Sequence, residues 1–240
     1  LDDGPLAAAD VAALAAASAL AMGGCVAITG CGTSGRVAQL VVRRMSRLLA
    51  TEPPAFDYLI SGGDAALLLS DELPEDDPLA GARQLAELCQ NRPACVHIGI
   101  SCGLSAPYVA GQLDHALCNA AIGEAPEGET GFAAVAIGFN PAAQARDHAV
   151  DGLGGNRRSF RDVAAALARS SGEGIGHALV NPVIGPEAIA GSSRMKGGSA
   201  SLILADAICF RAVRLCLAKP APTIYDAITK HQEAMRITYM

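Results

Sequence analysis

The 240-residue sequence has no tryptophan, and aromatic residues make up only 4% of it. A core without large rings must be built from alanine, leucine, valine and isoleucine, and hydrophobic residues at 51% are numerous enough for a sizeable one. The formal net charge is −6. This acidic balance argues against a nucleic acid or an anionic membrane as partner. A bound anion would therefore be held by a local pocket.

Several metal and nucleotide motifs are also missing. The chain has no GKS or GKT, which excludes a Walker loop, and no HxH, HExxH or CxxC. Its eight cysteines lie mostly in apolar surroundings, as in Ala94-Cys95-Val96. They are interpreted as reduced core thiols of an intracellular protein, so no metal and no cofactor are predicted. The alanine-rich start is taken as too short to span a membrane.

Apolar strand patterns alternate with helical patterns five times along the chain. Strands are expected at 25–29, 56–60, 95–100, 133–137 and 178–181, and the longer helices at 6–22, 34–49, 79–89, 107–119, 157–169, 194–217 and 223–237. Such alternation predicts an α/β fold in which helices cover both faces of a parallel sheet. Ligands on such sheets bind at the carboxyl ends of the strands.

Three loops that follow predicted strands are rich in hydroxyl groups. The most informative is the run 191–200, which combines serines, glycines and two cations at the expected start of a helix. Free backbone N–H groups and the helix dipole favour an anion there. The hydroxyl residues of the three loops are Thr33 and Ser34, Ser101 and Ser105, and Ser192 and Ser193. All should meet at one edge of the sheet, which predicts a phosphate site.

Two motifs leave alternatives open. The spacing Gly30-x-Gly32-x-x-Gly35 also fits a dinucleotide fingerprint, with Asp64 roughly placed for a ribose. Glu72 and Glu75 lie on an acidic turn that is either solvated, with a helix cap following it, or directed at a bound ligand.

Taken together, the motifs resemble the sugar isomerase (SIS) domain family. Within it the sequence is most similar to the branch that contains glucokinase regulatory proteins and bacterial N-acetylmuramic acid 6-phosphate etherases. The matching stretches are 32–36 (GTSGR), 62–64 (GGD), 99–107 (GISCGLSAP), 135–141 (VAIGFNP) and 181–199 (NPVIGPEAIAGSSRMKGGS). The resemblance implies a three-layer, flavodoxin-like α/β/α sandwich with a five-stranded parallel sheet that binds a phosphosugar.

The resemblance also assigns roles to residues. It implies that the six hydroxyl residues surround the sugar phosphate, that Arg194 and Lys196 support this loop, and that Glu75 contacts the sugar. The candidate ligand-binding residues are Gly32, Thr33, Ser34, Glu72, Glu75, Ser101, Ser105, Ser192, Ser193, Arg194 and Lys196.

The etherase-type family members use a second catalytic glutamate on the helix after the first glycine loop. An ungapped count places Arg44 there, and residues 37–51 contain no glutamate. Arginine cannot take and return a proton near neutral pH. The resemblance therefore favours a regulator that binds fructose 6-phosphate or fructose 1-phosphate and inhibits a sugar kinase, a glucokinase or hexokinase. An etherase, or another phosphosugar lyase or isomerase in which Glu75 is catalytic, is the alternative.

The expected domain organisation follows the same resemblance. Residues 1–219 are predicted to form the SIS domain, and 220–240 a linker and the start of a helical connection to a second domain. We expect the chain to be part of a longer protein whose site is completed by a second SIS domain in cis or by a homodimer. A cytoplasmic or nuclear location is expected.

Overall fold

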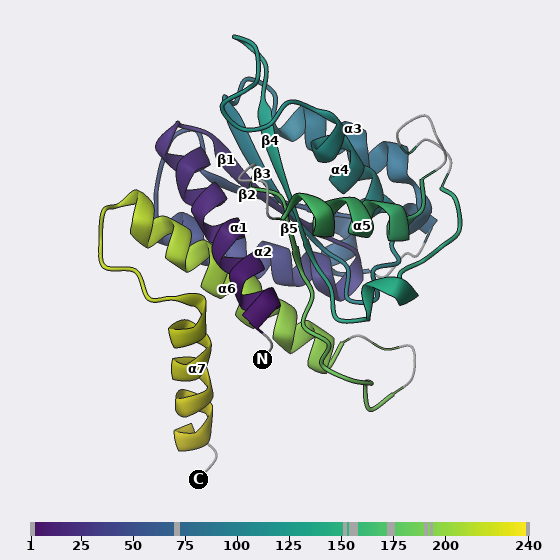
Figure 1. Ribbon diagram of the computed structural model, residues 1–240, viewed down its shortest axis with the longest axis vertical. Helices are drawn as coiled ribbons and strands as arrows, with labels where there is room; N and C mark the ends of the chain where they lie inside the picture. The colour runs from purple at the N-terminus through teal and green to yellow at the C-terminus, as the bar shows by residue number, and fades with distance from the viewer. Residues whose placement is uncertain are drawn as a thin grey trace.

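A computed structural model describes residues 3–69, 73–150, 153, 158–171, 176–189, 192 and 194–238. Its centre is one parallel sheet of five strands in the order β2-β1-β3-β4-β5 (Figure 1). The strands are β1 (Cys25–Gly30), β2 (Phe56–Ile60), β3 (Ala94–Ile100), β4 (Gly131–Ile137) and β5 (Ala178–Val180). This is the predicted sheet, and its order is that of flavodoxin-like folds.

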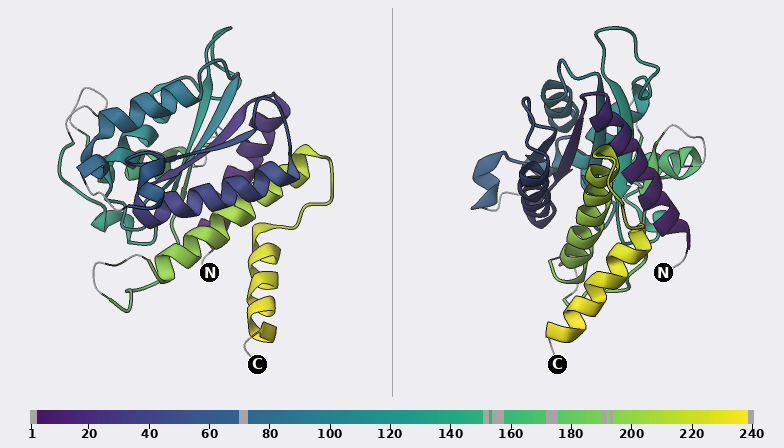
Figure 2. Two further views of the ribbon diagram at one scale, coloured as in Figure 1. Left: turned by 180° about the vertical axis from the view of Figure 1, so that it is seen from behind. Right: turned by 90° about the vertical axis from the view of Figure 1, so that its left-hand side faces the viewer.

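Helices cover both faces of the sheet, which gives three layers (Figure 2). One layer contains α1 (Asp3–Ala21), α2 (Gly32–Leu48) and α6 (Lys196–Cys216), and the other α3 (Pro78–Leu88), α4 (Pro107–Cys118) and α5 (Phe160–Ser170). Strand residues alternate between the two cores, so Val26 and Ile28 face the first layer while Cys25 and Ala27 face the second. Short 3₁₀ turns occur at η1 (Asp64–Leu67), η2 (Leu73–Asp76) and η3 (Ala142–Gln144).

The first helix, α1, is an alanine-faced core helix. Its buried residues are Ala8, Ala9, Ala12, Ala13, Ala16, Ala19 and Leu20. The prediction that this segment is too short to span a membrane is wrong. Residues Gly4–Ala21 are long enough, and with a mean hydropathy of 1.5 apolar enough, to cross one by length and composition. In the fold, however, α1 packs against α6 and β5. Small side chains allow this close approach of helix to helix.

Two glycines set the contact between α3 and α4. A β-carbon on Gly81 would collide with the carbonyl of Tyr108, and one on Gly111 with the carbonyl of Pro78. Glycine is therefore required at both crossing points. The contact matters for the site because α3 directly follows η2, which carries Glu75.

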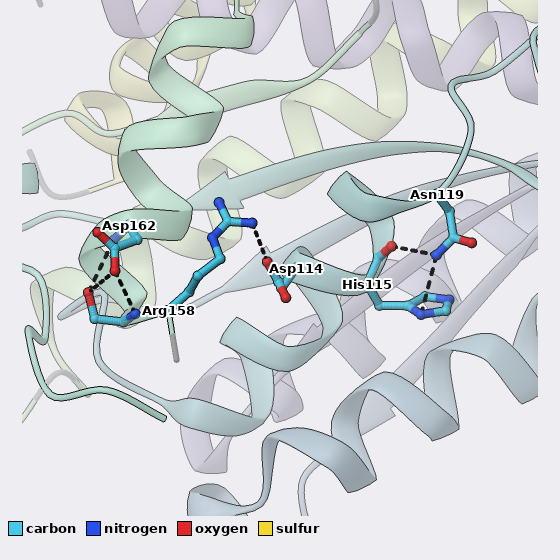
Figure 3. A network of polar contacts seen from close by, with 6 residues as sticks. Asp114, His115, Asn119, Arg158 and Asp162 are labelled. Atoms are coloured by element: carbon cyan, nitrogen blue, oxygen red, sulfur yellow. Dashed lines mark hydrogen bonds and ion pairs between the residues drawn. The ribbon is translucent and has the colours of Figure 1, made fainter. Parts of the chain in front are cut away.

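An ion pair and a capping box fix the entry into α5 (Figure 3). Arg158 Nη1 donates to Asp114 Oδ1 on α4 at 2.6 Å. Ser159 then caps α5: its hydroxyl accepts from the backbone N–H of Asp162, while the Asp162 carboxylate accepts from the Ser159 backbone. The start of α5 is thus tied to α4.

The last helix, α7 (Ile224–Thr238), extends away from the three layers (Figure 1). Only its beginning is held in the core, where Ile224 is fully buried. Before it, Arg211 Nη1 on α6 donates to the carbonyl of Pro222 at 2.6 Å.

Candidate functional site

The strand order reverses direction between β1 and β3, and the loops after these two strands form the heart of the candidate site. Beneath them lies a buried polar network that links β1, β3 and α4. Thr29 Oγ1 donates to Gln112 Oε1 at 2.6 Å and lies 2.9 Å from His97 Nε2. Since Thr29 uses its proton on Gln112, His97 Nε2 must be the donor to Thr29. Burial lowers the pKa of His97 to about 3, so the ring is neutral.

The loop between β1 and α2 turns sharply on glycine. A β-carbon on Gly30 would lie 2.7 Å from the backbone carbon of Ser34, and Gly32 has a φ of +49°. The N-cap residue of α2, Cys31, makes no side-chain capping bond. Thr33 is half-buried and Ser34 is buried. The first N–H groups of α2 are therefore presented at the sheet edge without a side-chain cap, as an anion would require.

The loop between β3 and α4 is organised by Ser101. Its hydroxyl accepts from the backbone N–H groups of Ser105 at 3.1 Å and Ala106 at 3.4 Å. Ser101 is consequently a buried support of the loop, whereas Ser105 is exposed. Leu104 has a φ of +52° and packs its side chain into the core, which fixes the bend. Of the two predicted serines, Ser105 is the one that a ligand can reach.

The start of α6 differs from the prediction. Glu187 already holds it: its carboxylate accepts from the N–H of Lys196 at 2.9 Å and of Gly197 at 2.7 Å. These bonds lower the pKa of Glu187. Lys196 directs its ammonium to the carbonyl of Ile184 at 3.3 Å, and Arg194 is exposed. A side-chain anion therefore occupies the helix end at which the sequence predicted a phosphate.

Cys102, in the loop after β3, contacts both α2 and α6. Its Sγ lies 3.8 Å from Ser34 Oγ on α2 and 3.6 Å from Ser201 Oγ on α6. A β-carbon on Gly197 would lie 3.1 Å from the same sulfur. The loops after β1 and β3 thus lie beside the first turns of α6, while the convergence predicted for Ser192 and Ser193 remains a prediction. The sequence pattern gave no reason to single out Cys102, Glu187 or Ser201.

The acidic turn reaches this edge through Glu75. Its Oε1 would lie 3.5 Å from a β-carbon on Gly32. The pKa of the Cys31 thiol is raised, mainly by burial and secondly by the charge of Glu75. Beside it, Arg146 Nη1 lies 3.2 Å from Asp76 Oδ1 and 3.4 Å from the carbonyl of Ser105. The Asp77 carboxylate caps α3 by accepting from the N–H of Ala80, so the turn is followed by a helix cap, one of the two predicted alternatives.

Four further positions were named from the sequence, and the structure describes two of them, Ser192 and Arg44. Glu72 and Ser193 lie outside the described residues. Ser192 is half-buried, and its N–H donates to the carbonyl of Ile189 at 3.1 Å. Arg44 lies 12 residues along α2 from Gly32, about 18 Å at 1.5 Å per residue. It pairs with Asp206 on α6 at 3.0 Å. A carboxylate at position 44 would therefore not reach this loop.

A groove of 1120 Å³ lies elsewhere, between α2, α6 and α7. Its lining includes Arg44, Asp206, Phe210 and His231. The sheet edge remains the candidate ligand site, because uncapped helix N–H groups, hydroxyls and Glu75 come together there.

Comparison with known proteins relates the chain to one domain family. Residues 8–117 match the family model of the glucokinase regulatory protein N-terminal SIS domain. Over this stretch the chain is similar to SIS domains of this type. It is 37% identical over 218 residues to the glucokinase regulatory protein of Xenopus laevis, covering 89% of this chain and 33% of the relative, and 40% identical over 192 residues to that of Mus musculus, covering 79% and 29%.

Etherases are also similar to this chain. The N-acetylmuramic acid 6-phosphate etherase of Gloeobacter violaceus is 44% identical over 100 residues, covering 42% of this chain and 32% of the relative. A phosphoheptose isomerase structure from Francisella tularensis shares 16% identity, with a TM-score of 0.49 and coverage of 86% and 84%. The chain spans about a third of the length of the glucokinase regulatory proteins that it matches.

Proposed function

We propose that this chain binds a phosphosugar at the carboxyl edge of β1 and β3. The observation that carries the proposal is the convergence of Ser34, Cys102 and the start of α6, beside an α2 N-terminus that lacks a side-chain cap. Backbone N–H groups, Thr33 and Ser34 would hold the phosphate, with Ser105 at the rim. Because Glu187 holds the α6 N-terminus, the phosphate belongs at α2.

Glu75 would accept hydrogen bonds from the sugar hydroxyls. Its carboxylate lies beside Gly32, at the mouth of the same loop. Arg146 supplies a positive charge nearby that is already shared with Asp76. We infer that Glu75 contacts the sugar and that the N–H groups of α2 hold the phosphate. Fructose 6-phosphate and fructose 1-phosphate are the ligands that we propose.

The role that we propose is regulation of a sugar kinase, in a cytoplasmic or nuclear protein. Support comes from the similarity to glucokinase regulatory proteins and from the lack of a second carboxylate on α2. General acid–base catalysis of ether cleavage would need two groups that exchange protons. The similarity to etherases keeps lyase activity as the second candidate.

Glu75→Gln separates these candidates. As a binder, the variant should lose about 1.5–3 kcal/mol of affinity for fructose 6-phosphate, the range for a hydrogen bond to a charged group. Glu87→Gln on the exposed side of α3 is the matched control and should bind normally. Titration calorimetry measures both.

The same proteins are then incubated with N-acetylmuramic acid 6-phosphate and assayed for lactate. If the protein is a regulator, no lactate should be released. Steady lactate release by the unmutated protein that disappears in Glu75→Gln would show instead that the protein is an etherase.

A further inference from the structure

Three buried cysteines gather at the opposite end of the sheet from the candidate site. Cys25 is the first residue of β1, Cys95 is the second residue of β3, and Cys89 caps the end of α3. Their side-chain sulfurs all lie within 4.8 Å of one another. The exposed fractions are 1% for Cys25 and Cys89 and 0% for Cys95.

The fold itself brings the three sulfurs together. Cys25 and Cys95 are register partners on adjacent parallel strands, so their side chains lie on the same face of the sheet. The segment from α3 to β3 returns Cys89 over this pair, with its sulfur 2.8 Å from that of Cys95. Thr130 Oγ1 holds the return by donating to the carbonyls of Cys89 and Arg92. Two strands and one helix end thus define the positions of the three thiols.

We propose that Cys25, Cys89 and Cys95 bind one copper(I) ion. Thiolates are the soft ligands that copper(I) prefers. In the part of the chain that the structure describes, no fourth histidine, cysteine or carboxylate joins the group. Structural zinc takes four protein ligands, so a three-sulfur set suits a three-coordinate soft ion better. The positive charge of Arg92 acts on Cys25 and Cys89 and would offset part of the negative charge of the bound thiolates.

Only a small movement is needed to close the site. Metal–sulfur bonds of about 2.3 Å in a trigonal arrangement separate the sulfurs by about 4 Å. Cys89 and Cys95 would therefore have to move apart by roughly 1 Å, which side-chain rotation can supply. A Cys89–Cys95 disulfide would need an oxidant and would leave Cys25 without a role.

Copper(I) uptake tests the proposal directly. The purified, reduced protein is titrated with copper(I) under anaerobic conditions against the colorimetric chelator bicinchoninate. The unmutated protein should take up one equivalent more than Cys89→Ser and one more than Cys25→Ala. Cys209→Ser removes a buried thiol outside the group and is the control, which should keep the full uptake. Copper(I) should also raise the unfolding temperature of the unmutated and control proteins but not of the two variants.

Three outcomes would overturn the proposal. One is equal copper(I) uptake by all four proteins, and another is no uptake by the unmutated protein. The third is a Cys89–Cys95 disulfide, found by mass spectrometry of the protein as isolated. Circular dichroism checks that each variant is folded, and if Cys89→Ser is not, Cys25→Ala carries the comparison, since alanine is small and apolar like the thiol it replaces.

Discussion

At the scale of single residues, His97 is a neutral, buried base beneath the loops that follow β1 and β3. The unfolded state binds a proton near pH 6.5, whereas burial lowers the pKa of folded His97 to about 3. The unfolded state therefore holds more protons between these values, and stability falls as the pH falls through this window. Its ring also links two strands through Thr29, so its protonation would disturb the β1–α2 turn.

Exchange of His97 for glutamine should remove this pH dependence. Between pH 7 and pH 5 the histidine costs the unmutated protein about 2 kcal/mol of unfolding free energy. Denaturant unfolding at both pH values measures the difference. Between pH 7 and pH 5, His97→Gln should lose about 2 kcal/mol less unfolding free energy than the unmutated protein. His148, in an exposed loop, provides the control as His148→Gln. Equal pH dependence in the unmutated protein and His97→Gln would refute the assignment.

The positions of candidate residues were predictable only where hydroxyl residues follow the ends of strands. Thr33, Ser34 and Ser105 follow strands and carry hydroxyls, so the rule for parallel sheets located them. Glu187 could not be found in this way, because its role depends on a loop that folds back onto α6. The contacts of Cys102 could not be predicted for a related reason, because nothing in the sequence around a cysteine indicates which distant segments it will touch.

At the scale of elements, the α3–α4 crossing positions the acidic turn. Gly111→Ala places a methyl group against the carbonyl of Pro78, at the first residue of α3. Overpacking of this kind costs about 1–3 kcal/mol. Because η2 precedes Pro78 directly, Glu75 should shift as well, and phosphosugar affinity should fall together with stability.

Thermal unfolding and ligand titration of Gly111→Ala measure the two effects. Gly4→Ala is the control, since nothing lies within 4 Å of a β-carbon there and α1 should be unchanged or slightly stabilised. A Gly111→Ala protein as stable as Gly4→Ala would show that the crossing is not as tight as described.

The elements themselves were largely predictable. All five strands and the seven longer helices follow from apolar alternation and helical spacing, and their ends differ from the expected ones by up to about three residues. The glycine crossing was not predictable, because a single glycine in a helix does not show what packs against it. The 3₁₀ turn at Leu73–Asp76 was expected only as an acidic turn, since proline and acidic residues mark a turn without fixing its type.

At the scale of the whole molecule, α7 and the groove beside it expose apolar surface in the described part of the chain. The groove is lined by Leu202, Ile203 and Phe210 together with charged residues, and Tyr225 on α7 is 60% exposed. Uncovered apolar surface marks an interface. We propose that residues 220–240 begin the connection to a further domain and that this surface packs against it or against a second copy.

The 240-residue chain alone should therefore self-associate and bind phosphosugar weakly. Sedimentation velocity over a range of concentrations detects the association, and Phe210→Glu should weaken it by placing a charge in the groove. Leu14→Glu, at an exposed position on α1, is the control. A concentration-independent monomer would contradict this account of the α7 surface.

The central claim is that the edge of β1 and β3 recognises a phosphorylated sugar. Thermal unfolding of the protein tests it, with fructose 6-phosphate, fructose 1-phosphate, fructose and NAD as ligands. At about 100 times the dissociation constant, either phosphosugar should add about 2.7 kcal/mol to the stability. Fructose and NAD should add little, and Glu75→Gln should reduce the phosphosugar effect. Equal stabilisation by fructose, stabilisation by NAD alone, or no change with millimolar phosphosugar would contradict the account.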